Sequence, residues 1–240
     1  MALLLVTGAS SGLGLATATT LAEAGHDVVV HARDAARLND ETLQRRMRGA
    51  VYGDLSRLEE TRGVAEQANT VGRYDAVIHN AGTMSASDAL AVNTIAPYVL
   101  TALMAPPGRC IVLSSSMHLS GTPRTDVLDE GRVSYCDSKL YVTAFAFALA
   151  HRWPQMLAHA VDPGWVPTRM GGRSAPDSLT EGHRTQEWLA TADQAEIDPR
   201  SGAYWHHGQA RRAHPAAYDR EFQDELLWAL EARTGIALPA

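Results

Sequence analysis

The sequence predicts an α/β fold in which a doubly wound parallel sheet carries helices on both faces within a single domain. Short apolar runs alternate with longer helical patterns along most of the 240 residues. A glycine-rich turn follows the first apolar run, and clusters of small polar residues follow later ones. These clusters matter because ligands of such sheets bind beyond the carboxyl ends of the strands.

Six strands are predicted from short runs of apolar, often β-branched residues, which are typical of strands buried on both faces. The run Val28-Val29-Val30 is one example. The expected strands are Leu3–Val6, Asp27–His31, Ala50–Gly53, Asp75–His79, Cys110–Ser114 and Leu157–Val161.

Seven helices are predicted from segments rich in helix formers, several of which end at glycine or proline, as at Gly25 and Pro154. Met170–Asp177 is expected to be a loop, so that about residues 168–192 form a substrate-side loop and helix within one domain spanning 1–240. The expected helices are Leu13–Glu23, Arg33–Gln44, Arg57–Ala68, Asn93–Met104, Ser134–Trp153, Leu179–Thr191 and Glu221–Arg233.

Charge and composition narrow the class of partner. The formal net charge of -6 argues against nucleic acid or an anionic membrane. No stretch approaches the roughly 20 apolar residues that span a bilayer, and the apolar run Met1–Val6 is too short for a signal peptide. Cys110 and Cys136 are too few for a disulfide framework. We therefore expect a soluble, cytoplasmic protein with reduced thiols and a small-molecule partner.

The segment Thr7–Gly14, TGASSGLG, lies between the first expected strand and helix. Gly8 permits a sharp turn, while Gly12 and Gly14 let the backbone approach a pyrophosphate and the helix pack on the strand. The helix N-terminus supplies free amides and the positive end of a dipole. The pattern therefore predicts a Rossmann-type dinucleotide site, and a purely structural turn is the alternative.

The residue that contacts the adenosine ribose is expected about 20 residues beyond the glycines, at the position of Arg33. An arginine suits a 2′-phosphate through a charge-assisted, bidentate contact, which favours NADP(H). Asp34, the next residue, could instead bind a ribose hydroxyl, so NAD(H) is possible. A solvated Arg33–Asp34 pair at a helix start is the alternative without ligand.

Tyr135 and Lys139 are four residues apart near the start of an expected helix, so both side chains lie on one face. A neighbouring ammonium favours the phenolate, so we expect Lys139 to lower the pKa of Tyr135 and to equip it for proton transfer. Ser115, in the run Ser114-Ser115-Ser116 after an expected strand, is the candidate for hydrogen bonding the substrate oxygen. Local loop hydrogen bonds are the alternative for these hydroxyls.

These motifs, in this order, resemble the short-chain dehydrogenase/reductase family over essentially the whole chain. The residues that carry the resemblance are TGASSGLG, Asn80-Ala81-Gly82, Asn93, Ser115, the Tyr135–Lys139 pair and Asp162-Pro163-Gly164. Ser114–His118, Ser138-Lys139-Leu140 and Ser201–Trp205 resemble the retinol-dehydrogenase-like branch more than the others.

The resemblance implies a catalytic tetrad in which Tyr135 is the general acid/base, Lys139 holds the nicotinamide ribose, Ser115 orients the carbonyl and Asn93 keeps a water. It implies hydride transfer between nicotinamide and a carbonyl or alcohol carbon. The implied cofactor-binding residues, with Asp54 at the adenine, are Gly8, Ser10, Ser11, Gly12, Leu13, Gly14, Arg33, Asp54, Leu55, Asn80, Ala81, Gly82, Tyr135, Lys139, Pro163, Gly164, Val166 and Thr168.

The chain departs from the family in two spacings. Asn80 and Asn93 are only 13 residues apart. This spacing shortens a helix region that often forms a subunit interface in the family, so the sequence leaves open whether the protein is a homo-oligomer. The same shortening could place Asn93 out of register. Ser115 and Tyr135 are 20 apart, so an insertion at Leu119–Val133 is expected near the substrate.

Several further residues have two interpretations. His118 could touch the substrate or form a pocket wall. Trp165, Met170 and Trp188 are equally suited to an apolar pocket wall and to core packing. The histidines 206, 207 and 214 lack the spacing of a closed metal site, so we expect surface residues and no metal.

Together these features predict an NADP(H)-dependent carbonyl reductase or alcohol dehydrogenase for a small to medium, lipophilic substrate. The alternative is a catalytically silent dinucleotide-binding sensor on the same fold. Such a protein could dispense with the tyrosine, lysine and serine that this chain retains.

Overall fold

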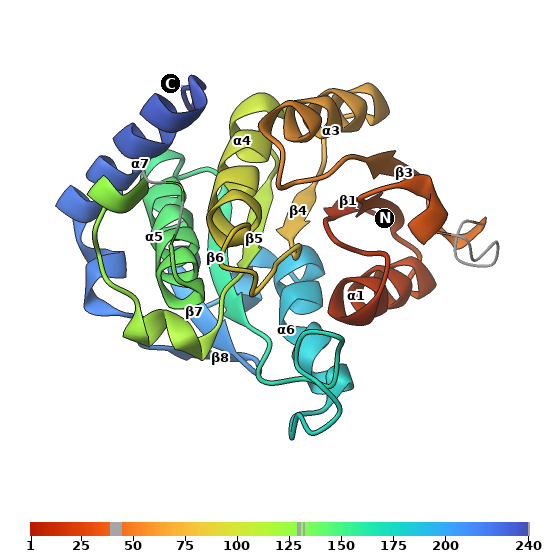
Figure 1. The fold of residues 1–240 in the computed structure, drawn as a ribbon. Coiled ribbons are helices and arrows are strands. Elements are labelled where there is room, and N and C mark those ends of the chain that lie inside the picture. The colour runs from red at the N-terminus through yellow and green to blue at the C-terminus, as the bar shows by residue number, and fades with distance from the viewer. Residues whose placement is uncertain (39–44, 129–130, 132, 240) are drawn as a thin grey trace.

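An eight-stranded sheet forms the centre of the molecule (Figure 1). The computed structural model describes all residues except 39–44, 129–130, 132 and 240. The strand order is β3-β2-β1-β4-β5-β6-β7-β8, with every pair parallel except β7–β8. This is the Rossmann-type α/β fold that the sequence predicts, because the order reverses direction at β1 and β4.

The six expected strands are confirmed, with shifts of one residue at some ends. Two more, β7 and β8, were not predicted. The three residues of β8 are all exposed and polar or small, so no apolar run marks them. The strands are β1 Leu3–Val6, β2 Asp27–Ala32, β3 Gly49–Tyr52, β4 Ala76–His79, β5 Arg109–Leu113, β6 Leu157–Asp162, β7 Ala203–His206 and β8 Gln209–Arg211.

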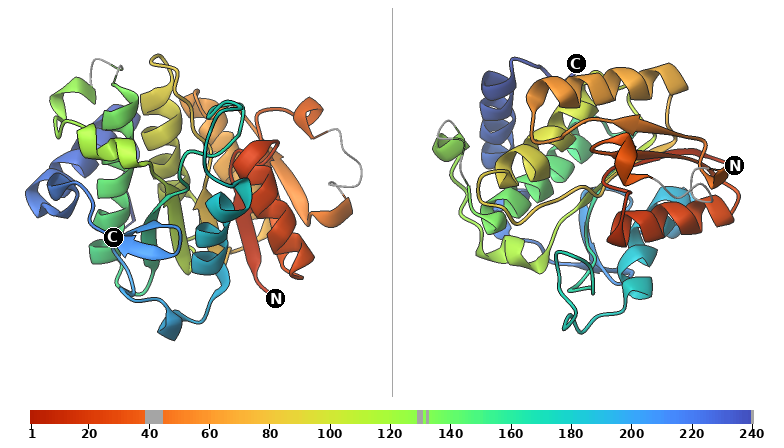
Figure 2. Two further views of the ribbon diagram at one scale, coloured as in Figure 1. Left: turned by 90° about the horizontal axis from the view of Figure 1, so that it is seen from below. Right: turned by 45° about the vertical axis from the view of Figure 1, so that its right-hand side comes forward.

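The helices cover both faces of the sheet (Figure 2). The helices α1 and α6 pack on one face, and α3, α4 and α5 cover the other, with α7 packed outside α5. Their bounds are α1 Gly12–Glu23, α3 Leu58–Val71, α4 Ala96–Leu103, α5 Tyr135–Arg152, α6 Leu179–Thr191 and α7 Arg220–Thr234. Within the described residues, no helix is both long enough and apolar enough to cross a membrane.

The helix predicted for Arg33–Gln44 is wrong at its start. Asp34 has an extended backbone with φ -152°, and only a 3₁₀ turn, Ala35–Arg37, follows it. The Asp34 carboxylate accepts a hydrogen bond from the Arg37 side chain, so these two side chains pair locally without an α-helical turn. Residues 39–44 of that prediction lie outside the described part of the chain.

Alternation along three neighbouring strands selects which side chains face α5. Cys110, Val112, Ala158, Ala160 and Tyr204 all join the apolar cluster under α5. Successive residues of a strand point to opposite faces, so the residues two positions further on point toward α5 as well. These are Ser114, Asp162 and His206, at the carboxyl ends of β5, β6 and β7. The Ser114 hydroxyl indeed lies 2.7 Å from the Thr143 hydroxyl of α5.

Helix α5 begins at a reciprocal capping box. The Ser134 hydroxyl accepts the Asp137 backbone N–H at 3.0 Å, and the Asp137 carboxylate accepts the Ser134 backbone N–H at 3.2 Å. The box satisfies two backbone donors at the helix start. It also fixes the backbone direction at Tyr135, the first residue of α5.

The capping box predicts a matched pair of stability effects. Ser134→Ala should lower the free energy of unfolding by about 1 kcal/mol, as loss of a serine N-cap does. Ser178 is the N-cap residue of α6 but makes no side-chain capping bond, so Ser178→Ala should cost much less. Urea denaturation followed by circular dichroism measures both, and equal losses would contradict the capping role of Ser134.

Candidate active site

The loop between β1 and α1 has the geometry of a phosphate cradle. Gly8 and Gly12 have φ of +64° and +58°, a left-handed conformation that favours glycine. A Cβ at Gly14 would lie 2.3 Å from the Asn80 side-chain nitrogen and 2.6 Å from the Gly8 carbonyl oxygen. Gly8 and Gly12 thus supply the turn, and Gly14 lets the helix start approach the Gly8 carbonyl and Asn80 more closely than a side chain would permit.

The N-terminus of α1 leaves its amides free for a ligand. Its N-cap, Ser11, makes no side-chain capping bond, and its first turn holds no acidic residue. The first N–H groups of a helix have no partner within the helix, so an anion can accept them. The cradle therefore fits the pyrophosphate of a dinucleotide. Ser10 and Leu13 flank this turn on the same loop and helix start.

Two residues after β4 brace the cradle. The Asn80 side-chain amide donates to the Thr7 carbonyl at 2.9 Å, and the Ala81 backbone N–H donates to the Thr7 hydroxyl at 3.0 Å. The next residue, Gly82, has an open α-carbon where a Cβ would lie 3.4 Å from Asn93 Oδ1 and 3.5 Å from Lys139 Nζ. The segment Asn80-Ala81-Gly82 thus joins the cradle to the Tyr135–Lys139 side of the site.

His31 is a part of the site that the sequence reasoning did not single out. Its Nδ1 accepts the Gly8 backbone N–H at 3.1 Å, so its Nε2 carries the proton and donates to the Gly53 carbonyl at 2.9 Å. Burial lowers the pKa of this imidazole, which favours the same neutral form. A buried histidine at the end of β2 therefore ties the cradle to the end of β3.

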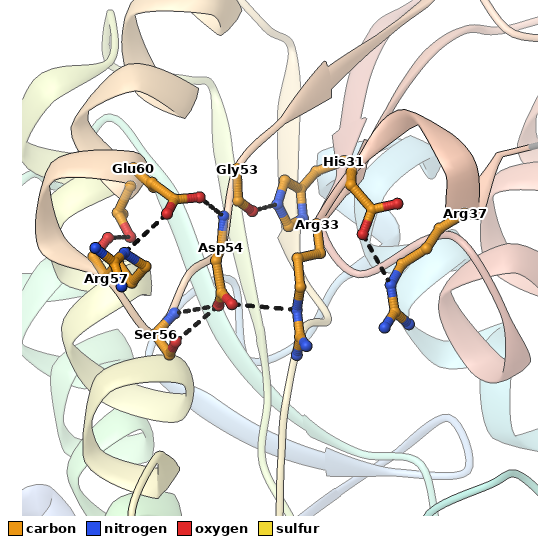
Figure 3. Close-up of polar contacts among 10 residues, drawn as sticks. His31, Arg33, Arg37, Gly53, Asp54, Ser56, Arg57 and Glu60 are labelled. Atoms are coloured by element: carbon orange, nitrogen blue, oxygen red, sulfur yellow. Dashed lines mark hydrogen bonds and ion pairs between the residues drawn. The ribbon is translucent and has the colours of Figure 1, made fainter.

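Arg33 and Asp54 lie at the ends of β2 and β3 with their side chains toward one another (Figure 3). Arg33 Nε is 3.3 Å from Asp54 Oδ2, and the arginine side chain is 58% exposed. Asp54 also accepts hydrogen bonds from the backbone and hydroxyl of Ser56 at 2.9 and 2.8 Å. Burial alone would raise the pKa of Asp54, but these bonds and the charges of Arg33 and Arg57 lower it. Arg33 is thus held next to a carboxylate yet remains accessible to a ligand.

The neighbourhood of this pair is set by two further ion pairs. Asp34, the alternative ribose ligand, is paired with Arg37 at 3.3 Å. Glu60 accepts the Asp54 backbone N–H at 2.7 Å and pairs with Arg57 at 2.9 Å, which positions the turn after β3 (Figure 3). Leu55, in the same turn, is buried.

Tyr135 and Lys139 lie on one face of α5, and the Lys139 ammonium is 5.6 Å from the centre of the Tyr135 ring. The expectation that Lys139 lowers the pKa of Tyr135 is wrong. Burial raises the pKa of Tyr135 to about 12, and a hydrogen bond with the Ser115 side chain opposes this only in part. The phenol is therefore protonated at neutral pH, ready to act as a proton donor.

Lys139 is the only lysine of the chain, and it is 4% exposed. Its Nζ donates to the Leu113 carbonyl oxygen, at the end of β5, at 2.6 Å. Burial lowers the pKa of Lys139 to about 8, and the charge of Asp162 opposes this shift. The ammonium is thus held at the carboxyl edge of the sheet in a setting that makes its charge costly.

Asn93 lies in a π-helical turn, Ala91–Ile95, that leads into α4. Its amide nitrogen donates to the Thr83 carbonyl at 2.9 Å and to the Ser138 hydroxyl at 3.0 Å, and its oxygen accepts the Thr83 N–H at 2.8 Å. Turns of this kind are frequent at functional sites. The helix begins before Asn93, so the short spacing from Asn80 still brings the asparagine to α5.

The segment after β6 returns to the cradle. Gly164 has φ +78°, and a Cβ there would lie 2.5 Å from an Asp177 carboxylate oxygen. Thr168 is close to Gly12, whose Cβ would lie 3.3 Å from the threonine methyl. Pro163 and the buried Val166 belong to the same loop, which therefore lies between the glycine cradle and α6.

The wall behind Ser115 is built around His118, together with His214 and Tyr204. His118 is fully buried and its Nδ1 lies 2.7 Å from the Ser115 carbonyl oxygen, while its Nε2 accepts the His214 backbone N–H at 3.0 Å. The imidazole is 4.5 Å from the ring of Tyr204. His118 is thus a wall residue that holds the Ser115 backbone, which is one of its two expected interpretations.

The remaining histidines form no metal site in the described residues. His206, the last residue of β7, and His207 stack at 3.9 Å and are only partly exposed, so the expectation of surface residues holds in part. Cys110 and Cys136 are free thiols, as expected.

Comparisons with known proteins agree with this geometry. A family model described as short chain dehydrogenase matches residues 2–178. An uncharacterized oxidoreductase of Emericella nidulans is 36% identical across 100% of this chain and 99% of its own length. The short-chain dehydrogenase chry4 of Gibberella zeae is 34% identical across 100% of both chains. Retinol dehydrogenase 13 of Mus musculus is 28% identical across 98% of this chain and 84% of its own.

The fold is also found among solved structures. A crystal structure of an uncharacterized protein from Mycobacterium paratuberculosis superposes with a TM-score of 0.82 and 25% sequence identity. The match covers 100% of this chain and 96% of that chain.

The buried lysine predicts an alkaline rise in stability. Between the native pKa of about 8 and the ordinary value of 10.5, the unfolded chain keeps a proton that the native Lys139 has lost. Stability therefore rises with pH in that window, by up to about 1.4 kcal/mol per pH unit. The unfolding free energy of wild type minus that of Lys139→Met should therefore become more positive from pH 8 to 10.5. Denaturant titrations at several pH values measure it, and a flat difference would contradict the lowered pKa.

Proposed function

Because this chain belongs to the short-chain dehydrogenase/reductase family, we propose that it is an NADP(H)-dependent enzyme that interconverts a carbonyl and an alcohol on a small to medium, lipophilic substrate. Its family acts on CH–OH and C=O groups with NAD(P)(H). The observation that carries the proposal is the convergence of Tyr135, Ser115 and Lys139 beside an open phosphate cradle.

The proposed proton chemistry belongs to Tyr135. When bound, the nicotinamide supplies or receives the hydride, and the protein supplies position and a proton. Tyr135 is partly buried and protonated, so it can donate to the carbonyl oxygen as the hydride reaches carbon. Ser115, hydrogen bonded with the same phenol, orients that oxygen. In the alcohol direction each proton moves the opposite way.

Lys139 and Asn93 support this proton transfer. The Lys139 ammonium would hold the nicotinamide ribose and stabilise negative charge on Tyr135. Asn93 lies beside Ser138 and next to Gly82, which faces Lys139, so it is placed to keep a water in a relay to the lysine. The residues proposed to bind the dinucleotide are Gly8, Ser10, Ser11, Gly12, Leu13, Gly14, Arg33, Asp54, Leu55, Asn80, Ala81, Gly82, Tyr135, Lys139, Pro163, Gly164, Val166 and Thr168.

The preference for NADP(H) rests on the charges at the ends of β2 and β3. Arg33 is exposed and its only ion pair among the described residues is to Asp54, so its planar group can turn to a 2′-phosphate. The competing ribose ligand, Asp34, is already paired with Arg37. The adenine would lie against the turn Asp54-Leu55.

The substrate class rests on an apolar rim. Among the described residues, most of the strongly exposed large apolar side chains lie in the segments that follow β4, β5 and β6, where we expect the substrate to enter: Met84, Met117, Leu119, Trp165 and Met170. Exposed apolar groups gathered at one edge mark a binding surface for an apolar partner. The loop and helix at about 168–192 would form the substrate side of this site.

A silent dinucleotide-binding sensor is the competing function. Tyr135→Phe separates the two, because it removes the proton donor and leaves the cradle intact. Turnover of a panel of lipophilic carbonyls should fall by at least about 100-fold, as loss of a general acid does, with the NADPH dissociation constant nearly unchanged by fluorescence titration. Tight NADPH binding by wild type with no oxidation on any carbonyl would favour the sensor, and an active phenylalanine variant would remove Tyr135 from the mechanism.

Arg33→Ala tests the cofactor preference. Loss of a charge-assisted phosphate contact should raise KM for NADPH by about tenfold or more and leave KM for NADH almost unchanged. Arg46→Ala is the matched control, since Arg46 pairs with Glu23 at the far end of α1. Steady-state kinetics with both cofactors measures the ratio, and equal changes would overturn the NADP(H) assignment.

A further inference from the structure

Asp162 is a buried carboxylate for which the proposed chemistry has no use. It ends β6 and is 4% exposed, and among the described residues only Glu187 is an acidic side chain of comparable burial. Taking a carboxylate out of water costs several kcal/mol unless partners compensate it. Its surroundings should therefore show what the charge does.

Three groups contact the Asp162 carboxylate directly. The Gly164 backbone N–H donates to Oδ1 at 2.9 Å, and the Tyr204 hydroxyl donates to Oδ2 at 2.8 Å. His206 Nδ1 lies 3.6 Å from Oδ2. Gly164 and Tyr204 both donate hydrogen bonds to the carboxylate, but neither carries a positive charge that would balance it.

The neutralising charge must come from the α5 side. Leu113, whose carbonyl accepts the Lys139 ammonium, pairs in register with Val161, one residue before Asp162. Neighbouring strands are about 4.8 Å apart. Asp162 points to the face that α5 covers, because Ala158 and Ala160 of the same strand do so. The carboxylate and the ammonium are thus buried at the same edge and on the same face of the sheet.

Lys139 has the complementary need. It forms no ion pair within 4 Å with any of the described carboxylates, and its hydrogen bond goes to a neutral carbonyl. A buried ammonium without a counter-charge would give up its proton. Asp162 is the buried carboxylate at this edge, and its charge opposes the loss of the proton from Lys139.

We propose that Asp162 is a positioning residue that keeps the buried Lys139 charged beside Tyr135. The inference rests on the proposed roles of Tyr135 and Lys139. A negative charge raises the pKa of a lysine and of a tyrosine alike, so one carboxylate favours the protonated form of both.

The same carboxylate anchors the wall behind Ser115. Tyr204 donates to Asp162 and packs against His118, whose Nδ1 holds the Ser115 carbonyl oxygen. The titratable groups that face Asp162 are thus Lys139 and Tyr135 from α5, His118 from the 3₁₀ turn Ser116–Ser120, and Tyr204 and His206 from β7.

The single lysine of the chain allows a direct test. In protein labelled with lysine carrying ¹³C at the ε carbon, one side-chain resonance reports Lys139, and its shift against pH gives the pKa without cofactor or substrate. The midpoint should lie near pH 8 in wild type. In Asp162→Asn, which keeps the shape and the acceptor, it should fall by about one pH unit.

Tyr204→Phe is the matched control, because it removes a hydrogen bond to the carboxylate but leaves the charge. Its Lys139 midpoint should stay within about 0.3 pH units of wild type, which is well below the shift of an opposite charge. If Asp162→Asn does not fold, the double variant Asp162→Ala/Tyr204→Phe removes the charge without leaving a buried hydroxyl unpaired. An unchanged or raised midpoint in the folded variant lacking the carboxylate overturns the proposal.

A second measurement links the charge to chemistry. For alcohol oxidation, which needs deprotonated Tyr135, the pH profile of kcat should shift in Asp162→Asn and not in Tyr204→Phe. A lysine shift without any turnover in wild type would retain the Asp162–Lys139 coupling and reject the enzyme function. Turnover that depends on Tyr135, with no shift of the Lys139 midpoint, would retain the enzyme function and reject the Asp162–Lys139 coupling.

Discussion

The Lys139 ammonium lies almost fully buried where β5 ends, and its hydrogen bond to the Leu113 carbonyl places a positive charge at the carboxyl edge of the sheet. Burying this charge is unfavourable, so the surrounding groups must either compensate it or let the proton go. Tyr135, Asn93 through Ser138, and the cradle through Gly82 are all arranged around this one group. The geometry of the site therefore follows from where α5 places Lys139.

The parallel sheet makes this placement of Lys139 possible. The parallel strands β1 to β7 end at one edge, so the polar residues Ser114, Asp162 and His206 are brought together on the face that α5 covers. Burial at this edge has opposite consequences for two side chains of the same helix. It lowers the pKa of Lys139 to about 8 and raises the pKa of Tyr135 to about 12. Both shifts follow from one cause, since desolvation always disfavours the charged form.

The dinucleotide half of the site is held by neutral and ionic contacts that serve different purposes. His31 and Asn80 bind backbone atoms of the cradle and keep it open, whereas Arg33 and Asp54 face solvent and remain available to a ligand. The first pair fixes shape in a buried setting, where a neutral imidazole and an amide cost little. Arg33 of the second pair is exposed, so an incoming phosphate can compete for it.

From the sequence alone one could derive the order of strands and helices, the glycine cradle and the Tyr135–Lys139 spacing, because each depends on local periodicity and on residues close in the chain. The six apolar strands and the start of α5 were predictable for that reason, while exposed β8 and the extended Asp34 were not. Only the tertiary structure decided that His31 binds Gly8, that Tyr204 joins Asp162 to His118, and that burial rather than Lys139 dominates the pKa of Tyr135. These features depend on contacts between distant segments and on the exclusion of water, neither of which a local pattern records.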